Sequence, residues 1–188
     1  MIHPQPTRPP RLEARSNLSK RFPMRWLYRS SVNWLLLRLS IRIKIKISPH
    51  YDSRFMSIIS ITRLRVRSWQ YLLPFLFYAL RSARQARHSQ GNVATTLLRD
   101  SDRTFWTRTV WTTESAMKDF MLAGAHRQAM RKLLEWCDEA SLVRWEQEDG
   151  REPTWAEAHQ KLQAQGRRSK VNHPSPAHES FRIRPPSS

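Results

Sequence analysis

One stretch near the middle of the chain combines residue types that could line a ligand site. Residues 103–111 read RTFWTRTVW and alternate large aromatic side chains with threonine and arginine. Within this stretch, Arg108 could pair with the carboxylate or phenolate group of a ligand. The wall of an apolar or aromatic pocket would come from four side chains: Trp106, Trp111, Trp145 and Tyr78. The same aromatic residues could equally serve only as core and interface, and this alternative stays open.

His126 is the candidate catalytic residue. It follows Gly124, which breaks a helical pattern, so we expect it near a helix N-terminus, where the helix dipole favours the neutral imidazole. A neutral imidazole could remove a proton from a phenolic or enolic substrate, or it could ligate haem iron. The cofactor therefore stays open between none and haem. A surface or helix-capping histidine is the structural alternative.

The elements that must position these residues follow from hydrophobic periodicity and from Gly and Pro punctuation. They are predicted in this order: a strand from Met56, a helix over 74–91, a hairpin of strands 92–100 and 103–111, helices over 114–122 and 125–137, a strand over 140–147 and a helix over 154–166. A slip in alternation between Ile61 and Leu64 predicts either a bulge or one fully buried end in the first strand. Thr154 and Glu157 predict a capping box at the start of the last helix, and the remaining tail is expected to be broken by prolines and mostly extended.

The order strand, helix, strand, strand, helix, strand predicts an α+β fold, the ferredoxin-like βαββαβ unit, with an extra C-terminal helix. On the strand 103–111, Trp106 and Arg108 share one face, and Phe105 and Trp111 share the other. The helices should cover one face of the sheet. An open face that carries Trp-sized residues would be a partner site, which predicts a homodimer with two sheets packed face to face.

Three blocks of this sequence also resemble a known family: RLRVRSW, FLFYALRSARQA, and RTFWTRTVWTTESAMKDFMLAGAHRQAMRKLLEWCDEASLVRW. They are similar to an uncharacterised bacterial family of the dimeric α+β barrel superfamily, related to antibiotic-biosynthesis-type monooxygenases and more distantly to spheroidene monooxygenase. The resemblance covers about residues 57–184, including SKVNHPSPAHESFRI. It implies a homodimer with a ligand pocket between each sheet and its helices. It does not fix an activity, because superfamily members range from cofactor-free oxygenases to haem binders.

Charge divides the chain unevenly. The formal net charge is +18, and residues 1–55 carry 12 Lys and Arg against 2 Asp and Glu, a net charge of +10. We expect this Pro- and Arg-rich extension to be disordered, and it is open whether it is an over-extended start, a targeting segment or a basic binding arm. Residues 56–150 would form the ferredoxin-like domain, and 151–188 its C-terminal helix and tail. The charge distribution does not favour nucleic acid as the partner.

The remaining motifs exclude several function classes. The single cysteine, Cys137, excludes an intramolecular disulfide and a CxxC metal site, and it fits a cytoplasmic protein. We expect Cys137 to be buried on a helix and inert. No run of about 20 apolar residues predicts a transmembrane segment. Glycine-rich phosphate loops, HExxH and GxSxG are also missing from the sequence.

The sequence thus predicts a monooxygenase-like protein of unknown substrate, a cytoplasmic homodimer that binds a small apolar or aromatic molecule in a Trp-rich pocket. Two alternatives remain. A structural or regulatory dimer would use the apolar sheet face only for association. A nucleic-acid or anionic-membrane binder would rely on residues 1–55 and on the arginines at 81, 84 and 87.

Overall fold

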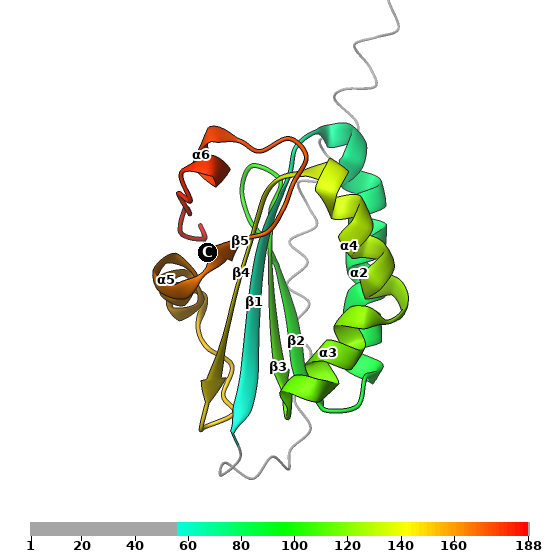
Figure 1. Ribbon diagram of the computed structural model, residues 1–188, viewed down its shortest axis with the longest axis vertical. Helices are drawn as coiled ribbons and strands as arrows, with labels where there is room; N and C mark the ends of the chain where they lie inside the picture. Colours follow the sequence, from blue (N-terminus) through cyan, green and yellow to red (C-terminus); the bar gives the residue numbers. More distant parts are fainter. Residues whose placement is uncertain (1–55, 188) are drawn as a thin grey trace, which may run out of the picture. The chain divides into compact units, whose positions relative to one another are not determined.

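A five-stranded antiparallel sheet organises the part of the chain that the computed structural model describes, residues 56–187. The strands are β1 (Ser57–Val66), β2 (Asn92–Arg99), β3 (Thr104–Trp111), β4 (Cys137–Gln147) and β5 (Arg167–Arg168). Their order across the sheet is β2-β3-β1-β4-β5, so β1 and β3 lie in the interior (Figure 1). The predictions for residues 1–55 fall outside the described residues.

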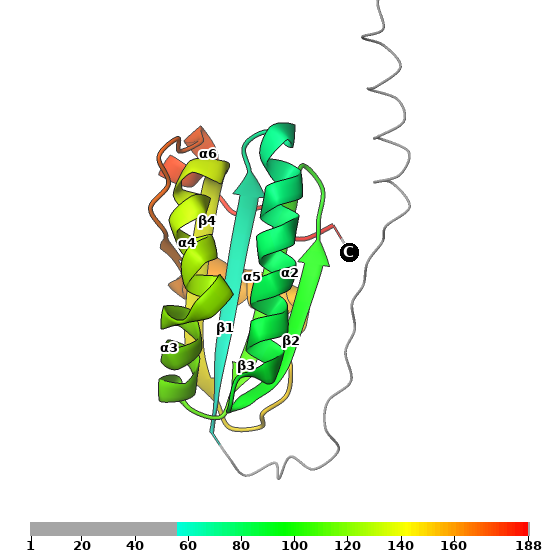
Figure 2. The ribbon, with the colours of Figure 1, turned by 90° about the vertical axis from the view of Figure 1, so that its right-hand side faces the viewer.

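Two helical layers flank this sheet. On one side lie the 3-10 turn η1 (Trp69–Tyr71) and the helices α2 (Leu72–His88), α3 (Glu114–Leu122) and α4 (Gly124–Trp136), with α2 and α4 side by side (Figures 1 and 2). The C-terminal helices α5 (Trp155–Gln165) and α6 (Pro176–Glu179) lie on the other side. The order of strands and helices confirms the predicted ferredoxin-like βαββαβ unit with an added C-terminal helix.

The structure confirms two predictions that rest on residues close together in the sequence, the capping box of α5 and the hairpin of β2 and β3. The capping box at α5 is present in both directions, with the Thr154 hydroxyl accepting from the Glu157 N–H and the Glu157 carboxylate accepting from the Thr154 N–H. Strands β2 and β3 form the predicted hairpin. Its turn places Asp102 and Arg103 at φ values of 51° and 57°, which is the conformation that two-residue hairpin turns require.

Two local predictions are wrong. Strand β1 has no bulge between Ile61 and Leu64, and its irregularity lies between Arg65 and Val66, opposite the start of β4. Alternation is regular through Leu64, but both faces of β1 are covered by the chain, so apolar residues occur in both phases. Cys137 is buried as predicted, yet it begins β4 rather than ending a helix. The tail contains the short elements β5 and α6, and the rest of it has no helix or strand within the described residues.

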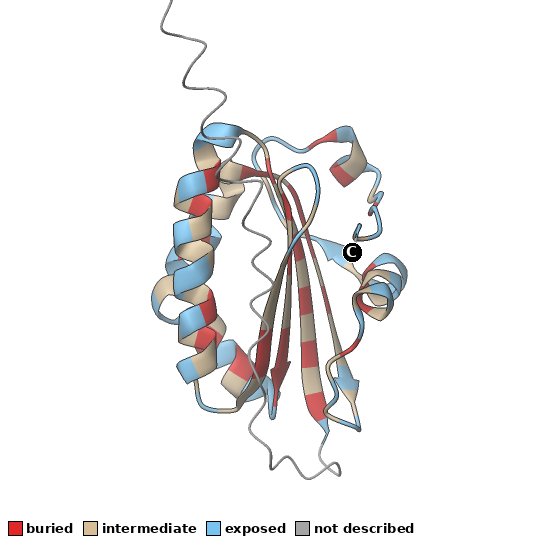
Figure 3. Ribbon diagram, turned by 180° about the vertical axis from the view of Figure 1, so that it is seen from behind, coloured by how far each residue is buried: buried red, intermediate tan, exposed pale blue. Residues whose placement is uncertain are grey.

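The sheet face opposite α2 and α4 is sealed within the chain. Its core joins sheet residues to α5 and the tail: Ile59, Ile61, Ala94, Trp106, Val110, Val143, Ala158, Leu162 and Ile183. Along β1, residues that point to this face are buried, whereas those that point toward α2 and α4 are mostly half-buried (Figure 3). The better-filled side of the sheet is therefore the α5 side, because Ala158 and Leu162 of α5 are fully buried against it.

This packing corrects the prediction of an open sheet face. The side chains that were expected to meet a second copy, Trp106 above all, are covered by α5 and the C-terminal segment of the same chain. A dimer of two sheets packed face to face would have to displace that cover and expose its apolar core to water. The homodimer stays a prediction, but its sheet-to-sheet form loses the observation that suggested it.

Candidate functional site

The predicted anion anchor, Arg108, is neutralised inside the chain. Its guanidinium contacts the Glu152 carboxylate and the Pro153 carbonyl, and it lies 4.5 Å from the centroid of the Trp155 ring. Trp106, two residues earlier on the same face, is fully buried, and its Nε1 donates to Asp100 Oδ2 over 3.2 Å. A cation that already has a carboxylate, a carbonyl and an aromatic ring as partners has little left to offer a ligand.

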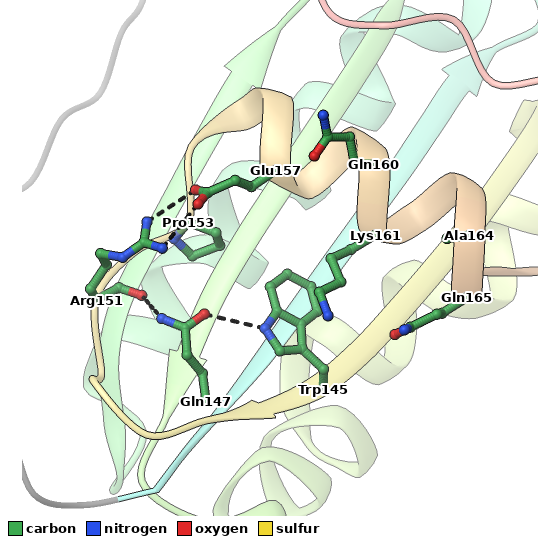
Figure 4. A pocket seen from close by; sticks show the side chains of 9 residues that line it. All are labelled: Trp145, Gln147, Arg151, Pro153, Glu157, Gln160, Lys161, Ala164 and Gln165. Atoms are coloured by element: carbon green, nitrogen blue, oxygen red, sulfur yellow. Dashed lines mark hydrogen bonds and ion pairs between the residues drawn. The ribbon is translucent and has the colours of Figure 1, made fainter.

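A cavity of about 350 Å³ does adjoin one of the predicted pocket residues, Trp145 (Figure 4). It lies between β4 and α5, and Lys161 reaches over the Trp145 ring at 5.8 Å from its centroid. The two other charged residues of the cavity neutralise each other, because Arg151 donates two hydrogen bonds to the Glu157 carboxylate. This arrangement lowers the pKa of Glu157 to about 2, so the cavity offers a binding surface without a proton acceptor suited to neutral pH.

The other predicted site residues lie on the opposite side of the sheet. Trp111 is fully buried beneath α2 and α3, where its Nε1 donates to Thr109 Oγ1 over 2.9 Å. Tyr78 of α2 packs against Trp136 of α4, with ring centroids 5.7 Å apart. His126 stands at the start of α4. The structure therefore separates Trp106, Arg108 and Trp145 from Trp111, Tyr78 and His126, and one pocket cannot hold all six.

His126 has the geometry of a neutral base. Its Nδ1 lies 3.2 Å from the Met121 carbonyl oxygen, which can only accept, so Nδ1 carries the proton and Nε2 keeps its lone pair. Burial lowers the pKa of His126, and the nearby charge of Arg144 acts in the same direction. The ring packs on Phe120 at a centroid distance of 4.5 Å. Within residues 56–187, Nε2 has no hydrogen-bond partner.

A glutamine on α2 fixes the position of this histidine. Gln85 accepts from the His126 N–H through Oε1 over 3.0 Å, and its Nε2 donates to the carbonyls of Phe120 and Ala123. Gly124 has φ +50°, and a Cβ there would come within 2.8 Å of Gln85 Oε1. The break between α3 and α4 is thus closed by a side chain from another helix. Sequence analysis missed Gln85, because the pairing spans 41 positions of the chain.

Arg144 is the second functional candidate that sequence analysis missed. It projects from β4 toward α3, where Nη2 lies 2.9 Å from the sulfur of Met121, the residue that also orients His126. Burial and the charge of Arg167 lower the pKa of Arg144, although an arginine stays protonated. Arg108 pairs with Glu152, whereas Arg144 forms no ion pair with a carboxylate of residues 56–187. The Nε atoms of both arginines are buried without a hydrogen-bond partner in this range. The sequence could have indicated Arg144, because it is a charged residue at a strand position that faces the helices.

Hydroxyl groups continue from Arg144 across the middle of the sheet. Ser60 pairs with both Arg144 and Thr109, and Thr62 pairs with Thr107, so these positions share the face under α2 and α4. We call Ser60, Thr62, Thr107 and Thr109 the hydroxyl band. It separates two apolar clusters on this face, one around Trp111 and one around Phe75. Three of its members are half-buried on interior strands, which means that solvent reaches the sheet beneath the helices.

Other chemistry finds little support in the described part of the chain. Over residues 56–187, no three His, Cys, Asp or Glu side chains gather closely enough to hold a metal ion. Burial raises the pKa of Cys137 to about 12, so its thiol is a poor nucleophile near neutral pH. In the same range, no helix is both long and apolar enough to cross a bilayer.

The fold defines a ferredoxin-like α+β protein, and His126 and Arg144 are its candidate site residues under the helical layer. The family described as "Domain of unknown function (DUF3291)" matches residues 82–182, from the middle of α2 into the C-terminal segment. This match spans more than half of the chain, and the chain belongs to that family. No curated protein matches the chain.

Solved structures with a similar fold include antibiotic biosynthesis monooxygenases, as the sequence resemblance predicts. One antibiotic biosynthesis monooxygenase has a TM-score of 0.43 and 11% identity, and covers 47% of this chain and 95% of its own. A variant of SnoaB, a cofactor-independent oxygenase from Streptomyces nogalater, has a TM-score of 0.42 and 19% identity, over 47% and 90%. A conserved protein from Methanosarcina mazei has a TM-score of 0.45 and 10% identity, over 50% and 94%. At TM-scores below 0.5, these similarities assign neither an activity nor a substrate to the chain. The more distant relation to spheroidene monooxygenase stays a prediction.

Proposed function

We propose that this protein is a monooxygenase-like enzyme that binds a small acidic aromatic molecule between the sheet and the layer formed by α2 and α4. The observation that carries the proposal is the pair of His126 and Arg144, a neutral base and a cation without a carboxylate partner, joined through Met121. His126 acts as the base and Arg144, in place of Arg108, as the anion anchor. These two residues support the base and the anion site, and the monooxygenase-like class is what the sequence resemblance implies.

Small buried residues on the two helices support a ligand between the helices and the sheet. The buried positions of α2 beyond its first turn are Ala83 and Ala86, and the buried position of α4 is Ala129. Opposite them, the hydroxyl band offers donors and acceptors, since Ser60, Thr62 and Thr107 make no side-chain hydrogen bond within the described range. An apolar ring with polar substituents matches a site with aromatic walls at the ends and hydroxyls between them.

The reaction class follows from the pairing of a neutral base, His126, with a cation, Arg144. His126 Nε2 takes a proton from a phenol, enol or activated methylene group, and the resulting anion pairs with the Arg144 guanidinium. Without a cofactor, the electrons for oxygen come from the substrate itself. An activated methylene group then reacts with O2 to give a carbonyl group, and the second oxygen atom leaves as water. The fully buried walls at both ends of the site would keep the anion from bulk water.

Binding of 4-nitrophenol to the full chain tests the two roles separately, because its phenolate absorbs visible light and its phenol does not. We expect the wild type to bind the probe as phenolate at a pH at which most of the free probe is still protonated. Arg144→Gln should weaken binding by about tenfold, the effect of a lost charge-assisted hydrogen bond. His126→Gln should retain binding but lose the shift toward phenolate.

The cavity beside α5 supplies the matched control. Arg151→Gln removes an exposed cation from that cavity and leaves the helix side of the sheet untouched, so probe binding should not change. If Arg151→Gln weakens binding and the His126 and Arg144 variants do not, the ligand lies beside α5 and the proposal is wrong. Haem is tested on the same variants, since an absorption band that appears on adding haem and is lost in His126→Gln would make His126 an axial ligand instead of a base.

A further inference from the structure

The outer side of α2 carries an apolar ridge that nothing in residues 56–187 covers. Leu73, Phe77 and Leu80 occur at positions i, i+4 and i+7, so they share one face of the helix, and they are 68%, 56% and 48% exposed. We call these three residues the α2 ridge. Trp69, one turn before it, is also exposed. Single exposed apolar residues are ordinary on a protein surface, but a continuous line of them marks an interaction site.

Cations surround this ridge without neutralising partners. The exposed basic side chains on α2 and α4 are Arg81, Arg84, Arg127, Arg131 and Lys132. None of them forms an ion pair within the described range, and α2 contains no Asp or Glu. Arg81 lies over the Phe77 ring at 5.4 Å, and Lys132 of α4 lies over the Tyr78 ring of α2 at 5.7 Å. Arg81 and Lys132 thus lie beside α2, whose outer side, next to α4, belongs to the helical layer seen in Figure 2.

We propose that this outer surface of α2 and α4 docks on an anionic lipid membrane. The charge complementarity is direct: the exposed cations of α2 and α4, which form no ion pair within residues 56–187, match a surface that supplies negative headgroups. Leu and Phe side chains that project between such cations insert at the boundary of headgroups and acyl chains, and a Trp nearby is typical of interfacial anchors. A membrane also needs no matching groove, which suits a ridge that projects from a helix.

Other occupants fit the surface less well. A second copy of the chain would bring the same cations to the ridge and no acidic residue on α2 to pair with them. The phosphates of a nucleic acid would pair with the arginines but would leave Leu73, Phe77 and Leu80 without apolar contacts. This inference does not depend on the proposed activity, because the ridge points away from the sheet and from His126.

Sedimentation of the full-length protein with lipid vesicles tests the proposal. We expect binding to vesicles of phosphatidylcholine with phosphatidylserine, weaker binding to phosphatidylcholine alone, and a decrease as salt is raised. The triple variant Leu73→Gln, Phe77→Gln, Leu80→Gln should bind at least about tenfold more weakly, because three apolar side chains no longer enter the membrane. This variant is decisive, since residues 1–55 carry a net charge of +10 and could attract vesicles by charge alone.

Leu122→Gln is the matched control, because Leu122 is 69% exposed but lies at the end of α3, away from the ridge. It should bind vesicles as the wild type does. All changed residues are exposed, so unchanged urea midpoints would confirm that both variants fold. Wild-type binding by the triple variant would overturn the proposal, as would the absence of binding to anionic vesicles. If the triple variant instead converts a dimer to a monomer in sedimentation velocity, the ridge is an interface between copies and the membrane proposal is wrong.

Discussion

Replacing Leu162 by alanine tests the central feature of the fold, the sealing of one sheet face by α5. Leu162 is fully buried, and it packs with Ala158 of α5 against the sheet core around Trp106 and Val143. A buried Leu→Ala change removes the transfer free energy of the lost atoms and leaves a cavity that relaxes only in part. For a site packed between a helix and a sheet we expect a loss of about 3 kcal/mol in the free energy of unfolding.

Urea unfolding measures this loss directly. With an m-value of about 2 kcal/mol per M, the midpoint should fall by about 1.5 M while the m-value stays constant. Leu122→Ala serves as control, because the same truncation at an exposed side chain should change the stability by less than about 0.5 kcal/mol. Equal midpoints for the two variants would mean that α5 does not cover the sheet in solution, and the face opposite α2 and α4 would again be available to a second copy.

Three further changes test single contacts. Glu152→Gln leaves the Arg108 guanidinium half-buried without its carboxylate and should lower the unfolding free energy by about 2 kcal/mol in urea titrations, whereas Glu146→Gln, an exposed site, should not. Gly124→Ala should cost more than about 1 kcal/mol by the same measurement, because φ is +50° and the new Cβ would displace Gln85; an unchanged midpoint would refute the proposed clamp. Burial lowers the pKa of His126, so the unfolded chain binds more protons and stability falls as the pH drops below about 6.5. His126→Phe should flatten this acid loss in part, since the lowered pKa of His178 leaves a contribution of its own; a profile identical to the wild type would exclude a neutral buried His126.

How far the sequence predicts this structure depends on the distance over which each signal acts. The capping box at Thr154 and Glu157 spans three residues, and the hairpin between β2 and β3 spans a two-residue turn. Both were predictable, because local geometry alone decides them. The element order predicted the ferredoxin-like unit for the same reason, since each strand and helix carries its own period.

The position of α5 could not be predicted in this way. Its apolar residues define a face to be buried but not the surface that buries it. Helix α5 could have packed on either face of the sheet, because β1 carries apolar residues on both faces. Long-range pairs decide the outcome, among them Arg108 with Glu152, which are 44 positions apart. Such a pair becomes visible only when the fold has brought its members together.

The two candidate site residues that the sequence concealed have a common physical origin. Arg144 occupies a strand position that faces helices, where the binary pattern expects an apolar residue, so pattern analysis treats it as a solvated charge. Gln85 lies on α2 among arginines and reads as a surface residue, although it holds the break before His126. Both polar residues make contacts with segments far away in the sequence, and local sequence patterns do not reveal such contacts. Functional residues are expected at positions where the local pattern and the fold disagree.

The two faces of the sheet also treat charge differently, and this difference indicates where a ligand belongs. On the α5 face, Arg63 is buried with Glu139, and Arg108 with Glu152, so each cation is compensated inside the chain. On the helix face, Arg144 contacts the sulfur of Met121 and forms no ion pair with a carboxylate of residues 56–187, although the charge of Glu114 acts on it from farther away. A half-buried charge without a carboxylate partner lowers stability, and an anionic ligand relieves that cost when it binds. This difference between the two faces supports the proposal that the anion of a substrate binds beside Arg144.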